Sequence, residues 1–278
     1  MSNLSVGIVG LPNSGKSTLF NTLLKRQVAQ VGNYPFTTIE PNVGIVEVPD
    51  DNLIALMDLI NPEKVIPATV KFIDIAGLVK NAHQGEGLGN QFLAKIREVD
   101  AIVHIIRGFE NPDIPHFYGS IDPLRDKEIV DLELELAGIK KPTIYVLNCS
   151  LKEGQKFNFP GWLTIDAQTG EGIDELIKNA YNVLGLITFY TIKGGKEITA
   201  WAIKKGTTAL EAAGKVHSDM AKGFIKAEVI GIEELLEIGQ QEKGKGVWTK
   251  AKSLGKIRLE GRDYQVKNGE VIEFKFNI

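Results

Sequence analysis

The feature that constrains this chain most is the octapeptide Gly-Leu-Pro-Asn-Ser-Gly-Lys-Ser at residues 10–17. It matches the pattern G-x-x-x-x-G-K-[ST]. An apolar run at residues 4–9 precedes it, and a helical pattern at residues 17–24 follows. In this context the glycines let successive backbone N–H groups face one phosphate, and the helix N-terminus adds a favourable dipole. We therefore expect a phosphate-binding loop (P-loop) between a strand and a helix.

The residues of this loop have distinct expected roles. Lys16 would reach the β- and γ-phosphates and act in catalysis, and Ser17 would ligate Mg²⁺. The residues expected to bind nucleotide here are Asn13, Ser14, Gly15, Lys16, Ser17 and Thr18.

Two further segments fit a triphosphate site. Asp74 follows the strand-like run at residues 70–73 and would hold Mg²⁺ through water, while the N–H of Gly77 would contact the γ-phosphate. Thr38 lies in a segment with two prolines and two threonines, residues 33–41. We expect that segment to become ordered when the Thr38 hydroxyl meets Mg²⁺.

The pattern of apolar runs predicts the fold class. Short β-branched runs at residues 44–48, 70–73, 101–106 and 143–147 alternate with helical patterns at residues 88–99 and 173–184. Such alternation is typical of an α/β protein with a doubly wound, mostly parallel sheet. From residue 187 onward, strand-like segments and short helical patterns predict a small α+β domain instead.

Composition supports two domains without a membrane span. The chain has 278 residues, no apolar run of 18 residues, and one cysteine, which together predict a soluble protein of the cytoplasm. Residues 1–186 carry a net charge of −7 and residues 187–278 a net charge of +4. We expect these two segments to be the domains. Within the second, residues 240–255 are rich in glycine and lysine and predict a mobile loop, in which Trp248 could stack on a nucleic-acid base.

Taken together, the motifs resemble the YchF, or Obg-like ATPase, family of Obg-related translation-factor GTPases. The resemblance rests on GLPNSGKSTLFN, NYPFTTIEPNVGIVEVPD and FIDIAGLVKNAHQGEGLGNQFLAKIREVDAIVHIIRGFEN, and continues through the carboxyl-terminal third. It implies a P-loop domain followed by a TGS domain of β-grasp fold, with a role in contacting the ribosome or structured RNA.

The chain departs from the family pattern in three places. Members carry a long helical insert where residues 136–141 here cross directly to the next strand. The family's base-reading motif ends in a carboxylate, but Leu151 stands at that position, three residues after Asn148. Asp166 replaces a small residue beside the base. We still expect Asn148, Cys149 and Ala167 to contact the base, with Glu153 as a distant substitute for the carboxylate.

Hydrolysis needs a group that orients water. Ras-like enzymes use a glutamine at the position that Leu78 occupies here, and a leucine side chain cannot hydrogen-bond. His83 lies in the glycine-rich segment that follows and is the expected catalytic substitute.

The sequence thus predicts a slow, Mg²⁺-dependent nucleoside triphosphatase that binds ATP at least as well as GTP and that associates with the ribosome or RNA. Two alternatives stay open. One is a nucleotide-binding scaffold with negligible hydrolysis, which Leu78 and the missing insert favour. The other is a guanine-specific Obg-like switch GTPase, against which Leu151 argues.

Overall fold

The fold is described from a computed structural model that covers residues 4–25, 42–75, 88–150, 156–157, 159–240 and 246–277. Its chain contacts divide into two compact units, one of residues 3–48 and 70–184 and one of residues 49–69 and 185–278. Each unit contains one six-stranded sheet. Within the described residues, no helix is both long and apolar enough to cross a membrane.

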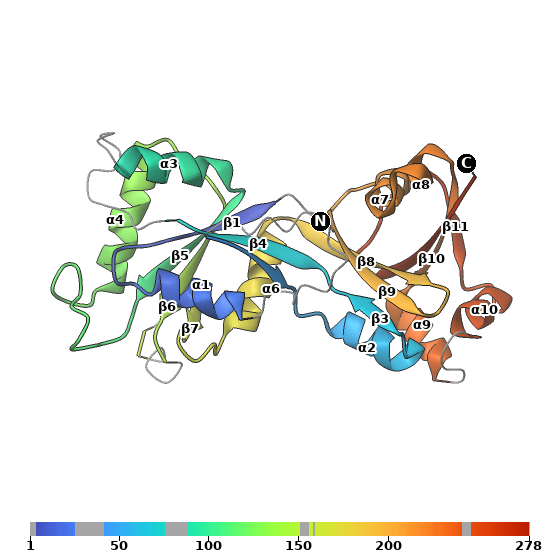
Figure 1. Ribbon diagram of the computed structural model, residues 1–278, viewed down its shortest axis with the longest axis horizontal. Coiled ribbons are helices and arrows are strands. Elements are labelled where there is room, and N and C mark those ends of the chain that lie inside the picture. Colours follow the sequence, from blue (N-terminus) through green and yellow to red (C-terminus); the bar gives the residue numbers. More distant parts are fainter. Residues whose placement is uncertain are drawn as a thin grey trace. The chain divides into compact units, whose positions relative to one another are not determined.

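The first unit is built on a sheet with the strand order β2-β4-β1-β5-β6-β7 (Figure 1). The strands are β1 (Ser5–Val9), β2 (Val43–Glu47), β4 (Thr69–Asp74), β5 (Ala101–Arg107), β6 (Thr143–Asn148) and β7 (Leu163–Ile165). Strand β1 pairs in parallel with β4 and β5, and β5–β6 and β6–β7 are parallel too. The α/β prediction for this part of the chain is confirmed.

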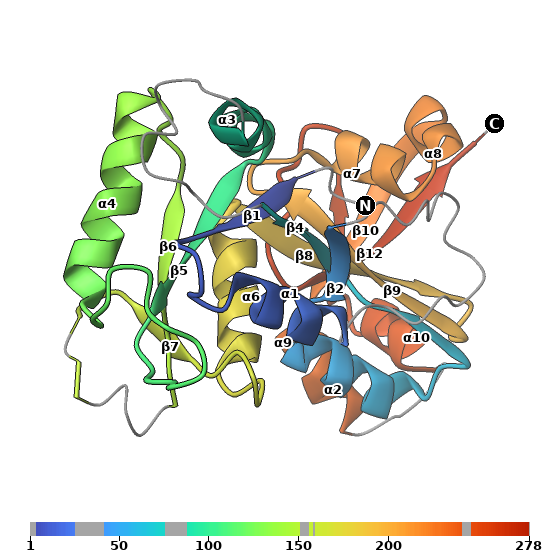
Figure 2. The same ribbon diagram turned by 60° about the vertical axis from the view of Figure 1, so that its left-hand side comes forward.

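Helices cover both faces of this sheet. Helices α3 (Leu88–Glu98) and α4 (Pro123–Leu136) pack on one face, and α1 (Lys16–Leu24) and α6 (Ile173–Val183) lie on the other, as Figure 2 shows. Gly7 lies in close packing on the face that α3 covers, because a Cβ there would lie 2.6 Å from Ile75 Cδ1. The chain order reverses at β1, since β4 and β5 flank it, and such a switch point is where α/β sheets bind ligands.

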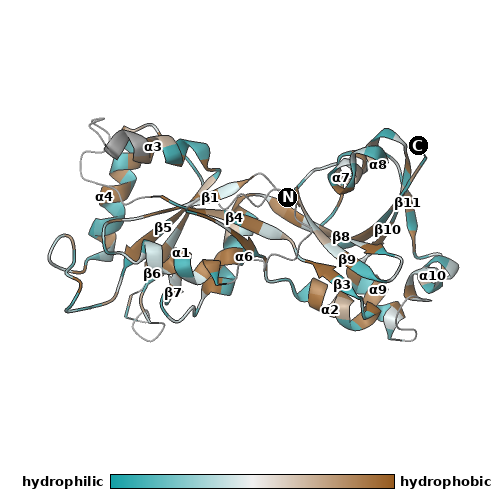
Figure 3. Ribbon diagram, viewed as in Figure 1, coloured by the Kyte–Doolittle hydropathy of each residue, from teal (hydrophilic) through white to brown (hydrophobic). Residues whose placement is uncertain are grey.

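The second unit has the strand order β11-β10-β12-β8-β9-β3. Its elements are α2 (Asp51–Ile60), β3 (Lys64–Ile66), β8 (Leu186–Lys193), β9 (Glu197–Lys204), α7 (Ala209–Val216), α8 (Ser218–Lys222), β10 (Phe224–Gly231), α9 (Ile232–Gly239), α10 (Gly246–Ser253), β11 (Arg258–Glu260) and β12 (Glu270–Phe276). Strands β8 and β9 form a hairpin, and β12 runs parallel to β8. Hydropathy colouring in Figure 3 shows apolar residues along both sheets.

The second unit includes a segment that lies before the predicted domain boundary at residue 186. Residues 49–69 belong to it, because β3 pairs in parallel with β9 and α2 packs on α9. The packing is close: a Cβ on Gly239 would lie 2.1 Å from Leu59 Cδ1. No periodicity in the sequence reveals that this segment completes a sheet formed some 130 residues later.

One local prediction in this unit is wrong. Residues 246–253 form helix α10 and not a loop, because Val247 and Ala251, four residues apart, are buried on one side of it. After β11, residues 262–266 hydrogen-bond through the backbone to residues 207–210, with an antiparallel bridge between Thr208 and Gln265. Residues 241–245 lie outside the described part.

The start of α2 depends on one carboxylate. Asp50 caps the helix, because its Oδ1 accepts from the N–H groups of Asn52 (3.0 Å) and Leu53 (3.1 Å). The buried Tyr190 hydroxyl also donates to Asp50, at 2.8 Å from Oδ2. This carboxylate therefore ties residues 49–69 to β8.

We predict that Asp50→Ala lowers the free energy of unfolding by about 2–3 kcal/mol, since it removes a helix cap and leaves a buried hydroxyl without this acceptor. Tyr190→Phe, which keeps the cap, should cost only about 1 kcal/mol. Urea unfolding of both variants measures the difference. Equal losses would mean that the cap contributes nothing.

Candidate nucleotide-binding site

The loop at residues 10–15 joins β1 to α1 and lies against neighbouring strands. A Cβ on Gly10 would lie 2.3 Å from the carbonyl oxygen of Ile105 in β5. Gly15 has a left-handed backbone with φ of 98°, and a Cβ there would lie 2.2 Å from Nδ2 of Asn148. Both motif glycines are therefore required by close packing as well as by the path of the loop.

Lys16 is folded back over this loop. Its side chain is buried, and Nζ donates to the carbonyl oxygens of Gly10 (3.0 Å) and Leu11 (2.7 Å). An ammonium group has three N–H donors, so one is left for a phosphate oxygen. Burial lowers the pKa of Lys16 to about 8, against the attraction of Asp74, which raises it. An anionic phosphate would favour the charged form.

Ser17 and Asp74 meet beside this lysine. Asp74 ends β4, next to β1 in the sheet, and its carboxylate accepts a hydrogen bond from the Ser17 hydroxyl. Burial raises the pKa of Asp74, while Lys16, Lys95 and the Ser17 hydrogen bond lower it. Across the described residues, no group of three or more His, Cys, Asp or Glu side chains could hold a metal ion alone. This pair of oxygen donors suits Mg²⁺ that shares its coordination with phosphates.

Asn148 connects three loops at the carboxyl ends of their strands. Its Nδ2 donates to the carbonyl oxygen of Ser14 (3.0 Å), and its Oδ1 accepts from the N–H of Ala167 (3.0 Å). The Thr22 hydroxyl donates to the carbonyl oxygen of Ala167 at 2.7 Å. These contacts bring together the P-loop and the two segments expected to contact the base, so Asn148 fixes their mutual positions.

The other residues expected near the base have partners within the protein. The Cys149 N–H donates to the carbonyl oxygen of Ile165 (2.9 Å), and its side chain packs with Ile106 and Leu147. Asp166 Oδ1 accepts from the N–H groups of the next turn, at Gln168 (2.9 Å) and Thr169 (3.1 Å). The aspartate in place of a small residue thus has a local reason, because it holds the turn that follows Ala167.

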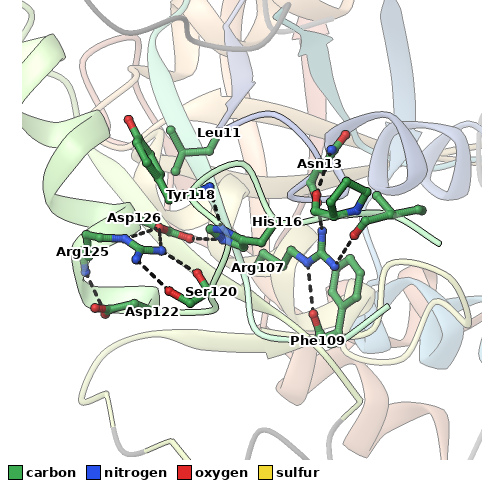
Figure 4. A network of polar contacts seen from close by, with 12 residues as sticks. Leu11, Asn13, Arg107, Phe109, His116, Tyr118, Ser120, Asp122, Arg125 and Asp126 are labelled. Atoms are coloured by element: carbon green, nitrogen blue, oxygen red, sulfur yellow. Dashed lines mark hydrogen bonds and ion pairs between the residues drawn. The ribbon is translucent and has the colours of Figure 1, made fainter. Parts of the chain in front are cut away.

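A polar network supports the far side of the P-loop, as Figure 4 shows. Asn13 donates from Nδ2 to the carbonyl oxygen of Pro115 (3.1 Å). Arg107, at the end of β5, donates to the carbonyl oxygens of Ile114 (2.8 Å) and Phe109 (3.0 Å) and more distantly to Asn13. The segment between β5 and α4 is therefore attached to the P-loop by an arginine and an asparagine.

The same segment is anchored at its other end by His116 and Asp126, both buried. His116 Nε2 lies 2.7 Å from Asp126 Oδ2, and its Nδ1 accepts from the N–H of Tyr118 (3.1 Å). With Nδ1 accepting, the proton of a neutral ring is on Nε2 and is donated to the carboxylate. Arg125 completes the network through Asp126 Oδ1 (2.9 Å).

Sequence reasoning missed Arg107, His116 and Asp126 because no motif connects them to residues 10–17. One signal was available for Arg107, since it directly follows the strand-like run at residues 101–106, and ligands of parallel α/β sheets bind beyond the carboxyl ends of strands. Asn13, Ser17 and Thr18 are exposed, as a ligand-facing loop and helix start require.

Several predicted residues lie outside the described part of the chain. These are Thr38, Gly77, Leu78, His83, Leu151 and Glu153. Their expected roles stay predictions.

The parallel sheet, the strand–loop–helix motif at its switch point and the Lys16–Ser17–Asp74 arrangement define the first unit as a P-loop nucleotide-binding domain. A family model described as a 50S ribosome-binding GTPase matches residues 5–149, and the YchF GTPase carboxyl-terminal model, described as a protein of unknown function, matches residues 186–277. The chain belongs to the YchF family, and its carboxyl-terminal part is the family's TGS-like domain.

Relatives match almost the whole chain. The "Ribosome-binding ATPase YchF" of Bacillus subtilis is 37% identical, covering 99% of this chain and 100% of the relative. That of Haemophilus influenzae is 36% identical, covering 98% and 99%. The structure of the Schizosaccharomyces pombe YchF GTPase matches with a TM-score of 0.77 and 26% identity over 98% of both chains.

The match with the Bacillus subtilis relative includes a long stretch that this chain lacks. That match spans 376 positions, whereas this chain has 278 residues, so about 100 positions of the match have no counterpart here. Helix α4 is joined to β6 by six residues only, 137–142. The turn is tight, because the Ile139 N–H donates to the carbonyl oxygen of Leu134 (2.9 Å) and Gly138 has a left-handed φ of 68°.

The buried lysine gives a pH-dependent prediction. Lys16 has a pKa of about 8 in the folded chain and its ordinary value of 10.5 when unfolded. Between these values the unfolded state binds more protons, so the free energy of unfolding should rise with pH, by at most about 3 kcal/mol. Lys16→Met should lack this rise. Urea unfolding of both proteins at several pH values from 7.5 to about 10 tests it, and parallel pH profiles would contradict it.

Proposed function

We propose that this chain binds ATP with Mg²⁺, hydrolyses it slowly, and acts as a nucleotide-controlled factor at the ribosome. The observation that carries the proposal is the meeting of Lys16, Ser17 and Asp74 at the carboxyl end of β1. An ammonium, a hydroxyl and a carboxylate around a P-loop are the parts that position a triphosphate and its metal ion.

The phosphates would contact the loop backbone at residues 13–18 and the remaining N–H donor of Lys16. Mg²⁺ would be held by Ser17 and Thr38, with Asp74 and Gly77 adjacent to the metal and γ-phosphate. When bound, the ion would neutralise charge that develops on the β- and γ-phosphate oxygens. The hydrogen bond between Ser17 and Asp74 supports this, because a hydroxyl that donates to the half-buried carboxylate keeps its oxygen lone pairs available toward a cation.

The base would lie near Asn148, Cys149 and Ala167. Oδ1 and one N–H of the Asn148 amide are engaged by protein backbone and hold the base-binding loops together, and the second N–H of Nδ2 would be left for the base. Guanine presents N–H donors that require an acceptor, and Leu151 stands where GTPases place a carboxylate. We therefore propose that ATP is bound at least as well as GTP.

For hydrolysis, we propose that His83 positions the attacking water, because the side chain of Leu78 cannot hydrogen-bond to it. The scaffold alternative, in which nucleotide occupancy alone controls partners, is favoured by the apolar character of Leu78. Single-turnover kinetics separate the two, because a scaffold would release ATP unchanged.

The ribosome is the proposed partner because the relatives named above carry it in their names. The net positive charge of residues 187–278 is compatible with contact to RNA. A ribosomal partner would place the protein in the cytoplasm.

We predict that isothermal titration with Mg²⁺ gives an ATP affinity equal to or tighter than the GTP affinity. Lys16→Met should weaken ATP binding at least about tenfold and abolish turnover, because a charge-assisted phosphate contact is worth about 1.5–3 kcal/mol. Unaltered affinity in the variant would remove Lys16 from the site. A GTP preference above about a hundredfold, about 2.7 kcal/mol, would support the guanine-specific alternative, with Glu153 the first acceptor to test.

We predict that His83→Ala lowers kcat by about 10²–10⁴ with little change in ATP affinity, the usual range for one positioned acid–base group. His116→Ala is the comparison, because His116 is the histidine attached to the P-loop through its own segment. Wild-type turnover in the His83 variant would exclude it, and loss in the His116 variant alone would show that turnover depends on the support that residues 109–122 give the P-loop.

A further inference from the structure

Helix α4 exposes apolar side chains on the face that does not pack on the sheet. Leu124, Leu132 and Leu136 are 51%, 54% and 56% exposed. The opposite face carries Val130 and Leu134, which are buried in the core that α4 shares with α3. Figure 2 shows α4 with the sheet on one side only. A helix that is apolar on two faces is ordinarily buried on both, so the outer face of α4 has the composition of a covered surface.

The exposed leucines belong to one continuous ridge, which we call the α4 ridge. Its members, Leu124, Glu128, Leu132 and Leu136, follow one another at intervals of four, and residues at this interval are neighbours on a helix surface. Glu135 lies beside Leu132, three positions further along. At 1.5 Å per residue the ridge is about 18 Å long. Rows of this spacing pack into the grooves of a second helix, and three leucines on one row indicate a contact surface where a single one would not.

The charge of the α4 ridge is negative and is not compensated within the helix. The two cations of α4, Arg125 and Lys127, already pair with aspartates of the same helix. Among the residues that the structure describes, neither Glu128 nor Glu135 forms an ion pair. Both glutamates are exposed and lie directly beside the leucines. A partner that covers the leucines therefore meets two negative charges at the same time.

This charge selects among the possible partners. The glutamates repel phosphate groups, and leucines offer nothing to a sugar–phosphate backbone, so the ridge disfavours RNA. A second copy of the ridge would bring glutamates against glutamates, and like charges in an interface are costly. Lysine or arginine side chains would instead complement both glutamates. The ridge therefore fits a helix that carries a row of apolar residues with cations beside it.

We propose that the α4 ridge binds a basic amphipathic helix of a partner protein. The apolar row of that helix packs against Leu124, Leu132 and Leu136, and its lysine or arginine side chains meet Glu128 and Glu135. The contact uses none of the residues expected to bind nucleotide and requires no bound nucleotide. A single helix face buries little surface, so the complex is weak and transient.

The test titrates the full ¹⁵N-labelled chain with a designed peptide and follows the backbone amide signals. The peptide has about 16 residues, long enough to form a helix, with leucines at intervals of three and four and lysines beside them. It should shift the signals of residues 124–136 saturably and leave those of α7 in place. A peptide of the same composition in scrambled order should bind at least about tenfold more weakly, because it keeps the charge and loses the apolar row. Oligouridylate, the RNA probe, should leave the signals of the ridge in place.

Variants at exposed positions separate the apolar contact from the charged one. Leu132→Ser should weaken binding of the peptide at least about fivefold. Glu128→Lys combined with Glu135→Lys should abolish it and confer binding of a matching peptide that has glutamate in place of lysine. Ile54→Ser is the matched control and should leave the affinity unchanged, because Ile54 is 57% exposed on α2 with Asp58 one turn away.

Five results would each overturn the proposal. These are the absence of any shift at millimolar peptide, equal binding of the ordered and scrambled peptides, an equal loss of affinity in Ile54→Ser and Leu132→Ser, failure of the charge-reversed variant to exchange its peptide preference, and movement of the ridge signals by oligouridylate. The last of these would assign the ridge to RNA instead of a protein helix.

Discussion

The amide of Asn148 is the contact on which the site depends. It joins the carbonyl of Ser14 to the N–H of Ala167, and it lies so close to Gly15 that no other residue fits there. Three loops that follow three different strands are thereby fixed with respect to each other before any ligand contributes. An amide suits this position because it offers a donor and an acceptor on one planar group.

Electrostatics at the P-loop are arranged around a partly desolvated cation. Lys16 gives up water for two loop carbonyls and the attraction of Asp74, and its lowered pKa measures the remaining cost. A triphosphate brings several negative charges to the same place. Part of the free energy of phosphate binding would therefore come from relieving a cost that the folded protein already carries.

The sequence predicts the parts of the structure that depend on neighbouring residues better than the parts that depend on contacts between distant residues. Residues 10–17 predict a P-loop, because the preceding strand, the two glycines and the start of the helix are all close together in the sequence. Asp74 could be predicted as a site residue because it directly follows a strand-like run. Runs of β-branched residues predict β5 and β6, because both are inner strands of the parallel sheet. The His116–Asp126 pair, the Asn148 contacts and the joining of β3 to β9 depend on residues 10 to more than 130 positions apart, which no local pattern records. The helix at residues 246–253 was hidden by its lysines and glycine, since only two of its eight residues are buried.

The placement of residues 49–69 has a consequence for the path of the chain. The chain passes from one compact unit to the other after residue 48, returns after residue 69, and passes again after residue 184. Residues 49–69 are therefore joined at both of their ends to the chain of the nucleotide-binding unit. The middle return also leads straight into the strand that ends at Asp74, because only two residues separate β3 from β4. The strand that completes the second sheet is therefore continuous in the chain, across two residues, with the strand that carries the carboxylate beside the P-loop.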